Sequence, residues 1–402
     1  MASPENQLLL PPLLLLLLEH PTIRRSTVFK CLGLKERGAV ANTCRGLSEL
    51  VQRCKGGSRS SSGESEGDGL LDVWSSLDFT GCRDAGVTFR AALQRPVVAG
   101  NMRHLSFEFC REIVDRDLVV LEAARLSLVS LNLNALHNIS GEGVLAAARG
   151  NSATLRHLSL YWLHALPSAS VAEVAKACPR LEVLNLSGCQ KTEDSAVRAL
   201  ARNCRGLTDL DLTRCPLLSG AALHFLAPRL THLRRLNLYA NAQIAPDASP
   251  GSGGSGEAAP QLQPNGSGGS PKPVETSGYA ALAQLSQLEF LDMCGASKAP
   301  PGDIAAIAAG CPNLATWNLS WCVRVTDDAV AAIARHCRKM ESLSLFGIIN
   351  LTDVAVDELA KPGRCGRVLR EIDVHGCCNI RRQKFDDLRE IFPKLSCFKL
   401  HS

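Results

Sequence analysis

A nine-residue pattern that recurs about every 26 residues is the strongest constraint on this 402-residue chain. The pattern is L-x-x-L-x-L-x-x-C, as in LEVLNLSGC from Leu181 and LATWNLSWC from Leu314. From Met102 onward, successive copies start 26–29 residues apart, except for a gap of 55 between Leu233 and Leu288 that equals one period plus an insertion. The other copies start at Trp74, Leu128, Leu155, Leu207, Met340 and Leu369, with a shortened copy at Leu395. A fixed period of this length predicts a repeat architecture.

Each copy predicts one strand followed by one helix. Apolar and polar residues alternate in the nine-residue pattern, which is the periodicity of a strand. The segment after it, such as QKTEDSAVRALARNCRG, places Ala, Val and Leu at helical spacing, with Thr192 or Thr326 as candidate N-caps. Neither element can bury its apolar face alone. We therefore expect neighbouring copies to stack, with a parallel sheet on the concave side and helices outside.

The spacing resembles the cysteine-containing leucine-rich repeats over about residues 70–402. This resemblance implies an α/β leucine-rich-repeat solenoid, with a parallel concave sheet and convex helices. A small helical module that does not share the repeat precedes it.

The 17 cysteines fit either a secreted disulfide framework or a reduced chain that uses Cys as a small apolar residue. The only candidate export signal runs from Leu8 to Leu18, lacks basic residues before it and is interrupted by Pro11 and Pro12, so we expect a reducing compartment. The repeat accounts for ten cysteines as packing residues, six at the ninth position and four placed three residues before the next copy. Paired spacings such as C-x2-C do not occur, so we expect no metal.

Two Gly/Ser-rich segments divide the chain. Residues 55–69 are typical of a flexible linker, and residues 246–277 of a disordered insertion between the strand and the helix of the copy that starts at Leu233. We therefore predict a helical module over 8–54, the linker over 55–69, and repeats over 70–402 that contain the insertion.

The N-terminal module contains two short apolar stretches separated by Gly33, which predicts two short helices. One interpretation is a cap over the open edge of the first repeat, which every solenoid needs. The module also resembles the F-box, which docks onto the Skp1 adaptor of a cullin ubiquitin ligase. It departs from that family at His20, where the family has Leu, and at Leu47, where it has Trp. By this resemblance the adaptor-binding residues are Pro21, Val28, Phe29, Leu32, Leu34, Val40 and Leu47.

F-box modules followed by cysteine-containing repeats form a known class, and WNLSWCVRVTD, SLSLFGI and FPKLSCFKLHS resemble its plant-type members. The resemblance implies a substrate receptor of a Skp1-cullin-F-box (SCF) ubiquitin ligase, monomeric within that hetero-complex. Such a receptor presents a protein target for ubiquitin-dependent proteasomal degradation in the cytoplasm or the nucleus. The alternative is a leucine-rich-repeat scaffold or regulator without a ligase role.

The sequence contains neither an H-E-x-x-H motif nor a phosphate-binding loop, and its ten histidines are scattered. We therefore expect no catalytic residues and no cofactor. The 44 basic and 39 acidic residues nearly balance, which does not predict nucleic-acid binding. The apolar run near the N-terminus is shorter than the roughly 20 residues that span a bilayer, so we expect no membrane partner.

The outward strand positions predict the surface that binds a target. The second, third, fifth, seventh and eighth residues of each copy point to the concave side. Most are small or polar, and the exceptions are aromatic residues and arginines, which dominate binding at protein interfaces. We expect target contacts from Phe109, Tyr161, Trp162, Arg214, Arg235, Tyr239, Trp321, Phe346 and His375. At the eighth position, Trp162 and Trp321 equally fit a structural role as lids over the neighbouring copy.

The reduced state of the cysteines can be tested by alkylation. We expect iodoacetamide to modify nearly all 17 thiols when the protein is denatured without reductant, because no disulfide protects them. Mass spectrometry counts the modified sites, and a reduced sample is the control. A secreted disulfide framework would leave most thiols unmodified until reductant is added.

Overall fold

The computed structural model describes residues 75–83, 85–94, 96–244, 278–381 and 385–396. The predicted N-terminal module, the linker and the insertion lie outside these residues, so their boundaries stay predictions. The described chain forms two compact units, a first unit that ends at Asn185 and a second unit that begins at Leu186.

The first unit alternates strands and helices in the order of the sequence. Its strands are parallel, and each pairs with the next in constant register, so that Leu77, Leu105, Leu131, Leu158 and Leu184 lie side by side. The strands are β1 (Ser76–Asp78), β2 (His104–Ser106), β3 (Ser130–Asn132), β4 (His157–Ser159) and β5 (Val183–Asn185). The helices are α6 (Ala85–Leu93), α7 (Pro96–Asn101), α8 (Asp115–Ala124), α9 (Gly141–Arg149) and α10 (Ser168–Ala177).

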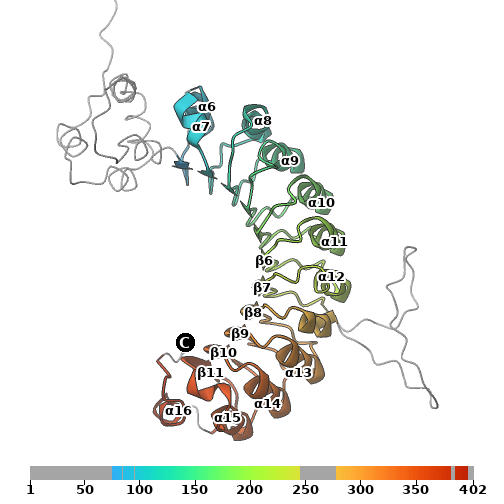
Figure 1. Ribbon diagram of the computed structural model, residues 1–402, viewed down its shortest axis with the longest axis vertical. Coiled ribbons are helices and arrows are strands. Elements are labelled where there is room, and N and C mark those ends of the chain that lie inside the picture. Colours follow the sequence, from blue (N-terminus) through green and yellow to red (C-terminus); the bar gives the residue numbers. More distant parts are fainter. Residues whose placement is uncertain (1–74, 84, 95, 245–277, 382–384, 397–402) are drawn as a thin grey trace, which may run out of the picture. The chain divides into compact units, whose positions relative to one another are not determined.

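The second unit repeats this arrangement. Its strands are β6 (Asp209–Asp211), β7 (Arg235–Asn237), β8 (Phe290–Asp292), β9 (Thr316–Asn318), β10 (Ser342–Ser344) and β11 (Glu371–Asp373). Its α-helices are α11 (Asp194–Asn203), α12 (Gly220–Leu226), α13 (Pro301–Gly310), α14 (Asp327–His336), α15 (Asp353–Ala360) and α16 (Phe385–Ile391). Two 3-10 helices, η2 (Gly278–Gln284) and η3 (Cys365–Arg367), complete it. In each unit the strands lie on one side and most helices on the other (Figure 1).

Strand pairing continues across the 55-residue gap in the repeat. β7 pairs in parallel with β8, and Leu236 lies beside Leu291 although their copies are separated by the insertion. The fourth position of every described strand is buried, and β9 places Trp317 there with no exposed surface. The expected α/β leucine-rich-repeat solenoid is therefore confirmed as the fold.

Five of the six ninth-position cysteines are buried in the turn that follows the strand, as predicted, and Cys82 is half-buried. Four of the buried thiols donate to the main-chain carbonyl of the sixth position in the preceding copy. The distances are 2.8 Å from Cys110 to Phe79, 3.4 Å from Cys215 to Leu186, 3.2 Å from Cys322 to Met293 and 3.1 Å from Cys377 to Leu345. No disulfide joins cysteines within the described ranges.

Burial keeps these thiols protonated. It raises the pKa of Cys110 to about 11 and that of Cys322 to about 12. A thiol must carry its proton in order to donate to a carbonyl, and the protonated form is a poor nucleophile. The cysteines therefore serve as small buried donors.

The helix starts differ from the predicted threonine caps. The N-cap of α11 is Glu193, while Thr192 is fully buried just before it. Thr326 does stand at the N-cap of α14, but its side chain makes no capping hydrogen bond. The capping side chains are instead Ser140, Ser219 and Thr352, which accept from the N–H groups of Glu142, Ala221 and Val354.

The aspartate at the helix start connects one repeat to the next. Asp327 accepts the N–H of Thr352 at 2.9 Å and the hydroxyl of Thr352 at 2.6 Å. Asp194 makes the same pair of bonds to Ser219, with its Oδ1 2.8 Å from the backbone nitrogen. The Thr-x-Asp and Thr-Asp sequences therefore indicate a bond between repeats in addition to a helix start.

Removing the Asp327 carboxylate should weaken the second unit. We expect Asp327→Ala to lower the free energy of unfolding by about 1–3 kcal/mol, because the backbone N–H and hydroxyl of Thr352 lose their acceptor. Asp327→Asn is the matched control, since its amide oxygen can still accept the N–H, and it should cost less. Urea unfolding of the full chain measures both, and equal midpoints for Asp327→Ala and the wild type would contradict this bond's role.

Candidate interaction surface

The side chains at the third, fifth and seventh positions of each repeat form a surface that we call the strand face. The fifth position is fixed by its own backbone: Asp211 Oδ1 accepts the N–H of Thr213 at 2.8 Å, and Asp292 Oδ1 accepts the N–H of Cys294 at 2.8 Å. Asn318 Nδ2 also donates to Asp292 Oδ2 at 3.1 Å on the neighbouring strand. Burial raises the pKa of Asp292 despite these bonds. The strand face is therefore a preorganised polar surface.

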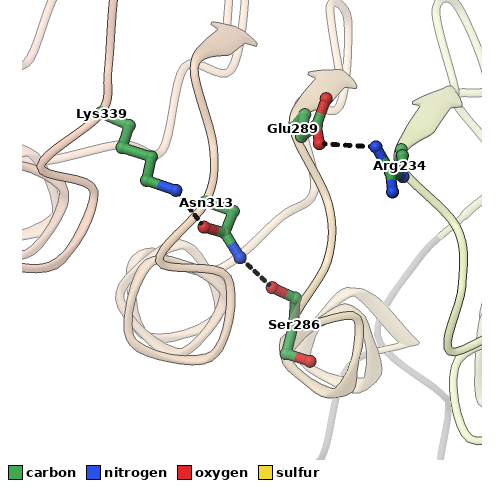
Figure 2. A network of polar contacts seen from close by, with 5 residues as sticks. All are labelled: Arg234, Ser286, Glu289, Asn313 and Lys339. Atoms are coloured by element: carbon green, nitrogen blue, oxygen red, sulfur yellow. Dashed lines mark hydrogen bonds and ion pairs between the residues drawn. The ribbon is translucent and has the colours of Figure 1, made fainter.

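The edge at which the strands begin is occupied by contacts within the chain. In the second unit, Arg234 Nη1 lies 3.5 Å from Glu289 Oε1, and Arg370 Nε lies 3.3 Å from Glu341 Oε2. Figure 2 shows the first pair beside a chain of hydrogen bonds in which Lys339 donates to Asn313 and Asn313 donates to the backbone carbonyl of Ser286. Because these groups satisfy one another, the other edge is the better candidate for a binding surface.

At that other edge, the eighth residue of each described repeat has a positive φ. Its N–H pairs with the next repeat, as from Trp321 to the carbonyl of Phe346 at 2.8 Å, while Cys322 N–H turns back to the carbonyl of Leu319. This turn suits glycine, which is present in five repeats, because other residues pay about 1–2 kcal/mol for the left-handed conformation. In the other six repeats the eighth residue is not glycine, and its φ lies between 52° and 64°. These residues are Phe109, Ala135, Trp162, Arg214, Ala240 and Trp321.

Three of these strained residues present large apolar side chains to solvent. Phe109 is 53% exposed, Trp321 52% and Trp162 37%. Strained backbone concentrates at sites where the conformation serves a function, and an exposed aromatic residue adds little to the core. The exposed rings and the left-handed backbone therefore give a physical argument for the predicted target contacts at Phe109, Trp162 and Trp321.

In the second unit, four side chains from two adjacent repeats form what we call the aromatic edge: Trp321, Val323, Phe346 and Ile349. The rings of Trp321 and Phe346 meet edge to face, with centroids 5.1 Å apart at 82°. Val323 is 38% exposed and Ile349 is 55% exposed. Sequence reasoning missed the two aliphatic residues because it stopped at the ninth position. Both lie at the tenth position, where an apolar residue is the signal, because other copies carry a polar residue there, such as Gln190 or Ser297.

Arg214 and Arg235 are exposed but already in contact with other side chains of the second unit. The guanidinium of Arg214 lies 5.7 Å from the ring centre of Tyr239, which is half-buried. Arg235 lies 4.2 Å from the ring centre of Phe290, and its Nε is 3.1 Å from Asp209 Oδ2. Burial raises the pKa of Asp209, and the charge of Arg235 opposes this shift. A target would have to share these arginines with their present partners.

In the first unit, Tyr161 and Trp162 lie together, with ring centroids 5.8 Å apart. Tyr161 is half-buried, and Trp162 lines a small cavity with Leu136 and His137 of the preceding repeat. These contacts are those of a structural lid, and the exposed part of the ring remains accessible. Both interpretations of Trp162 therefore keep support.

His375 is half-buried on β11's repeat, where its N–H donates to Asp373 Oδ1 at 3.0 Å and its carbonyl accepts from Gly347. The structure thus brings Phe346, whose ring contacts Trp321, and His375 to the same position of adjacent repeats. Within the described residues, no group of three or more His, Cys, Asp or Glu is placed to hold a metal ion, and no helix is long and apolar enough to cross a membrane. The predicted adaptor-binding residues, from Pro21 to Leu47, lie outside the described residues.

Comparison with known families matches residues 310–334 to the family described as Leucine Rich repeat, over β9 and most of α14. Similar solved structures include the crystal structure of the Rad7 and Elc1 complex in yeast, with 15% identity, a TM-score of 0.46, and 91% of each chain covered. The leucine-rich-repeat-containing protein LegL7 from Legionella pneumophila is 13% identical, with a TM-score of 0.43, over 80% of this chain and 97% of that chain.

An internalin (inlF) from Listeria monocytogenes is 14% identical, with a TM-score of 0.40, over 89% of this chain and 94% of that chain. At these TM-scores the likeness says nothing about partners or activity. The repeating strands and helices, together with the matched repeat, identify a leucine-rich-repeat fold suited to protein interaction.

The strain at Trp321 separates a structural lid from a binding residue. We expect Trp321→Gly to change the free energy of unfolding by less than about 1 kcal/mol, because relief of the positive φ offsets the lost contact with Phe346. Urea unfolding of the full chain measures the change. A loss of several kcal/mol would identify Trp321 as a lid.

Gly347→Ala serves as the control for this comparison. A Cβ at Gly347 would lie 2.9 Å from Trp321 Cε3, and φ there is +73°, so this variant should lose about 1–3 kcal/mol. Part of that loss should disappear in the Trp321→Gly background, where the ring is absent.

Proposed function

We propose that this chain is the substrate-recognition subunit of an SCF-type E3 ubiquitin ligase. Its N-terminal helices bind a Skp1-type adaptor and through it the cullin core, and its strand face binds a protein target. The target is then modified by other subunits and degraded by the proteasome. The chain contributes no catalytic residue, cofactor or metal, and acts in the cytoplasm or the nucleus as one copy within the complex.

The observation that carries target binding is the presence, in each of the two units, of large side chains held outward at the eighth position. Phe109, Trp162 and Trp321 keep a strained backbone and an exposed ring in a turn that glycine would fill without strain. Large aromatic side chains at a rigid position bind a partner at low entropic cost. A solenoid that carries them at the edge where its strands end is suited to capture a polypeptide.

The adaptor half of the proposal is supported by the sequence of residues 8–54 and its resemblance to the F-box. In such a complex, catalysis is positional. A tether raises the effective concentration of target lysines near the conjugating enzyme and orients them, while no bond is formed by the receptor itself.

A second candidate function is a leucine-rich-repeat scaffold or regulator, in which the N-terminal helices only cover the first repeat. The same exposed aromatic residues support this candidate, since they would bind a partner in either case. The two candidates differ only in whether the N-terminal residues hold an adaptor.

Substitution of Val28 and Phe29 distinguishes them. We expect the full chain with Val28→Asp and Phe29→Asp to lose co-purification with Skp1 and cullin, because two carboxylates cannot be buried in an apolar interface. Circular dichroism should show unchanged content of helix and strand, and unfolding by urea should be unchanged.

The matched control is Trp321→Ala, which is far from Val28 and Phe29 in the sequence. This variant should still co-purify with Skp1 while its target binding is weakened. Absence of Skp1 from the wild-type purification would contradict the ligase proposal and favour the scaffold.

A further inference from the structure

A cavity of about 450 Å³ lies in the first unit between the loops that follow α8 and α9. These two helices pack against each other (Figure 1). The volume is within the range of about 300–1,000 Å³ that small-molecule sites occupy. Polar side chains supply most of the lining, and those that matter below are Glu122, Arg125, Ser127, Arg149 and Ser152. Such a lining suits a polar ligand.

The cavity is present because these two repeats depart from the pattern of the others. After α10, α11, α13 and α14, three residues separate the helix from the next copy, and the first of them is a buried cysteine. After α9, the five residues 150–154 precede Leu155. After α8, Arg125 stands at the place of the cysteine, and it is exposed. A short loop and a buried thiol fill this space elsewhere, and neither is present here.

The backbone of Arg125 is strained. It is the C-cap of α8, with φ of 44° and ψ of 50°, in the left-handed region that glycine adopts without strain. Strain of this kind concentrates where a side chain serves a function. A charged side chain at a strained position that lines a cavity is therefore a candidate for ligand binding.

The floor of the cavity is fixed by hydrogen bonds between the two repeats. Asn151, which is 2% exposed, accepts the N–H of Leu128 at 3.1 Å through its Oδ1. The hydroxyl of Thr154 donates to the carbonyl of Leu128 at 2.8 Å. Gly150 lies so close to α8 that a Cβ there would be 2.3 Å from the carbonyl oxygen of Leu121. The loop is thus held in place, and the cavity is formed before a ligand arrives.

The charged side chains of the cavity have no bonded partner within the described residues. No hydrogen bond or ion pair there engages the side chain of Glu122, Arg125 or Arg149. In the second unit, by contrast, Arg234 and Arg370 at the same edge of the strands are paired with carboxylates. The first unit therefore leaves charged groups available to a ligand where the second unit does not.

The other charges around the cavity keep its sign positive. Arg180 of the following copy donates to the carbonyl of Ala153 at 3.0 Å, which places its guanidinium at the rim. Glu173 on α10 pairs with Lys176 at 2.7 Å. The hydrogen bond from Lys176 and, more weakly, the charge of Arg149 lower the pKa of Glu173. The lining and its rim therefore carry three guanidinium groups against one carboxylate, that of Glu122.

These groups define the chemistry of a ligand. Guanidinium groups bind phosphate through paired, charge-assisted hydrogen bonds. A carboxylate such as Glu122 accepts from hydroxyl groups, and the hydroxyls of Ser127 and Ser152 donate or accept. The excess of two positive charges matches a single phosphate, which carries about −1.5 to −2, and is too small for a polyphosphate or a nucleic acid.

We propose that this cavity binds a small sugar phosphate. The phosphate lies between Arg125 and Arg149, while Glu122 and the two serines hydrogen-bond to the hydroxyl groups of the sugar. This inference goes beyond target capture and does not depend on it, because the cavity lies at the edge where strands begin, whereas Phe109 and Trp162 lie where strands end.

Isothermal titration calorimetry of the full chain tests the ligand. Glucose 6-phosphate, fructose 6-phosphate and ribose 5-phosphate are compared with glucose, inorganic phosphate and a phosphoserine peptide. We expect at least one sugar phosphate to bind about tenfold or more tightly than each of the other three, because only a sugar phosphate engages both the arginines and Glu122.

Variants of the lining assign the contacts. Arg125→Gly should weaken the sugar phosphate about tenfold, yet unfold at the same or a higher urea concentration, because glycine fits this backbone. Arg149→Gln should weaken binding similarly. Glu122→Gln should weaken the sugar phosphate severalfold and leave inorganic phosphate unchanged. The matched control is Arg205→Gln, an exposed arginine in the regular loop after α11, which should bind as the wild type does.

Several outcomes would overturn the proposal. No binding of any of the three sugar phosphates would do so, as would affinity that Arg125→Gly leaves unchanged. Equal affinity for inorganic phosphate would indicate an adventitious ion only, and tighter binding of the phosphoserine peptide would indicate a protein segment instead. If Arg125→Gly is less stable than the wild type, Arg149→Gln decides, and its unchanged affinity would overturn the proposal.

Discussion

The structure depends on the parallel pairing of each repeat with the next, which continues past the strand to the eighth position. Trp321 N–H donates to the carbonyl of Phe346, and Gly347 N–H donates to the carbonyl of His375. The chain must turn immediately afterwards, so the eighth residue takes a positive φ whatever its side chain is. Glycine does this without strain, and Trp321 does it at a cost that also holds its ring outward.

The turn buries carbonyl groups that need donors, and small side chains supply them. The thiol of Cys322 donates to the carbonyl of Met293. Asn241, which stands at the ninth position of its repeat in place of Cys, donates its side-chain amide to the carbonyl of Leu212. At the helix start, Asp327 does the converse and accepts two bonds from the next repeat. A buried polar group without a partner destabilises a fold, which explains why these residue types recur with the period of the backbone.

The two edges of the strands have different properties. At the edge where strands begin, Arg234 and Glu289 satisfy each other, as do Arg370 and Glu341. At the edge where strands end, the eighth residues include Phe109, Trp162 and Trp321, whose rings are exposed to solvent. Partner binding is therefore proposed at the edge where these rings are exposed, since those charged groups at the other edge already contact one another.

The repeat, the strand positions and the buried leucines could be predicted from the sequence, because a period of 26 residues with alternation inside it leaves one way to bury every apolar face. The sequence also identified Trp321 and Phe346 as outward residues from their position in the copy. The contact between their rings, the addition of Ile349 and the stacking of Arg235 on Phe290 across the insertion were decided by tertiary structure. These contacts join different repeats, and only the register between neighbouring strands brings their side chains within reach.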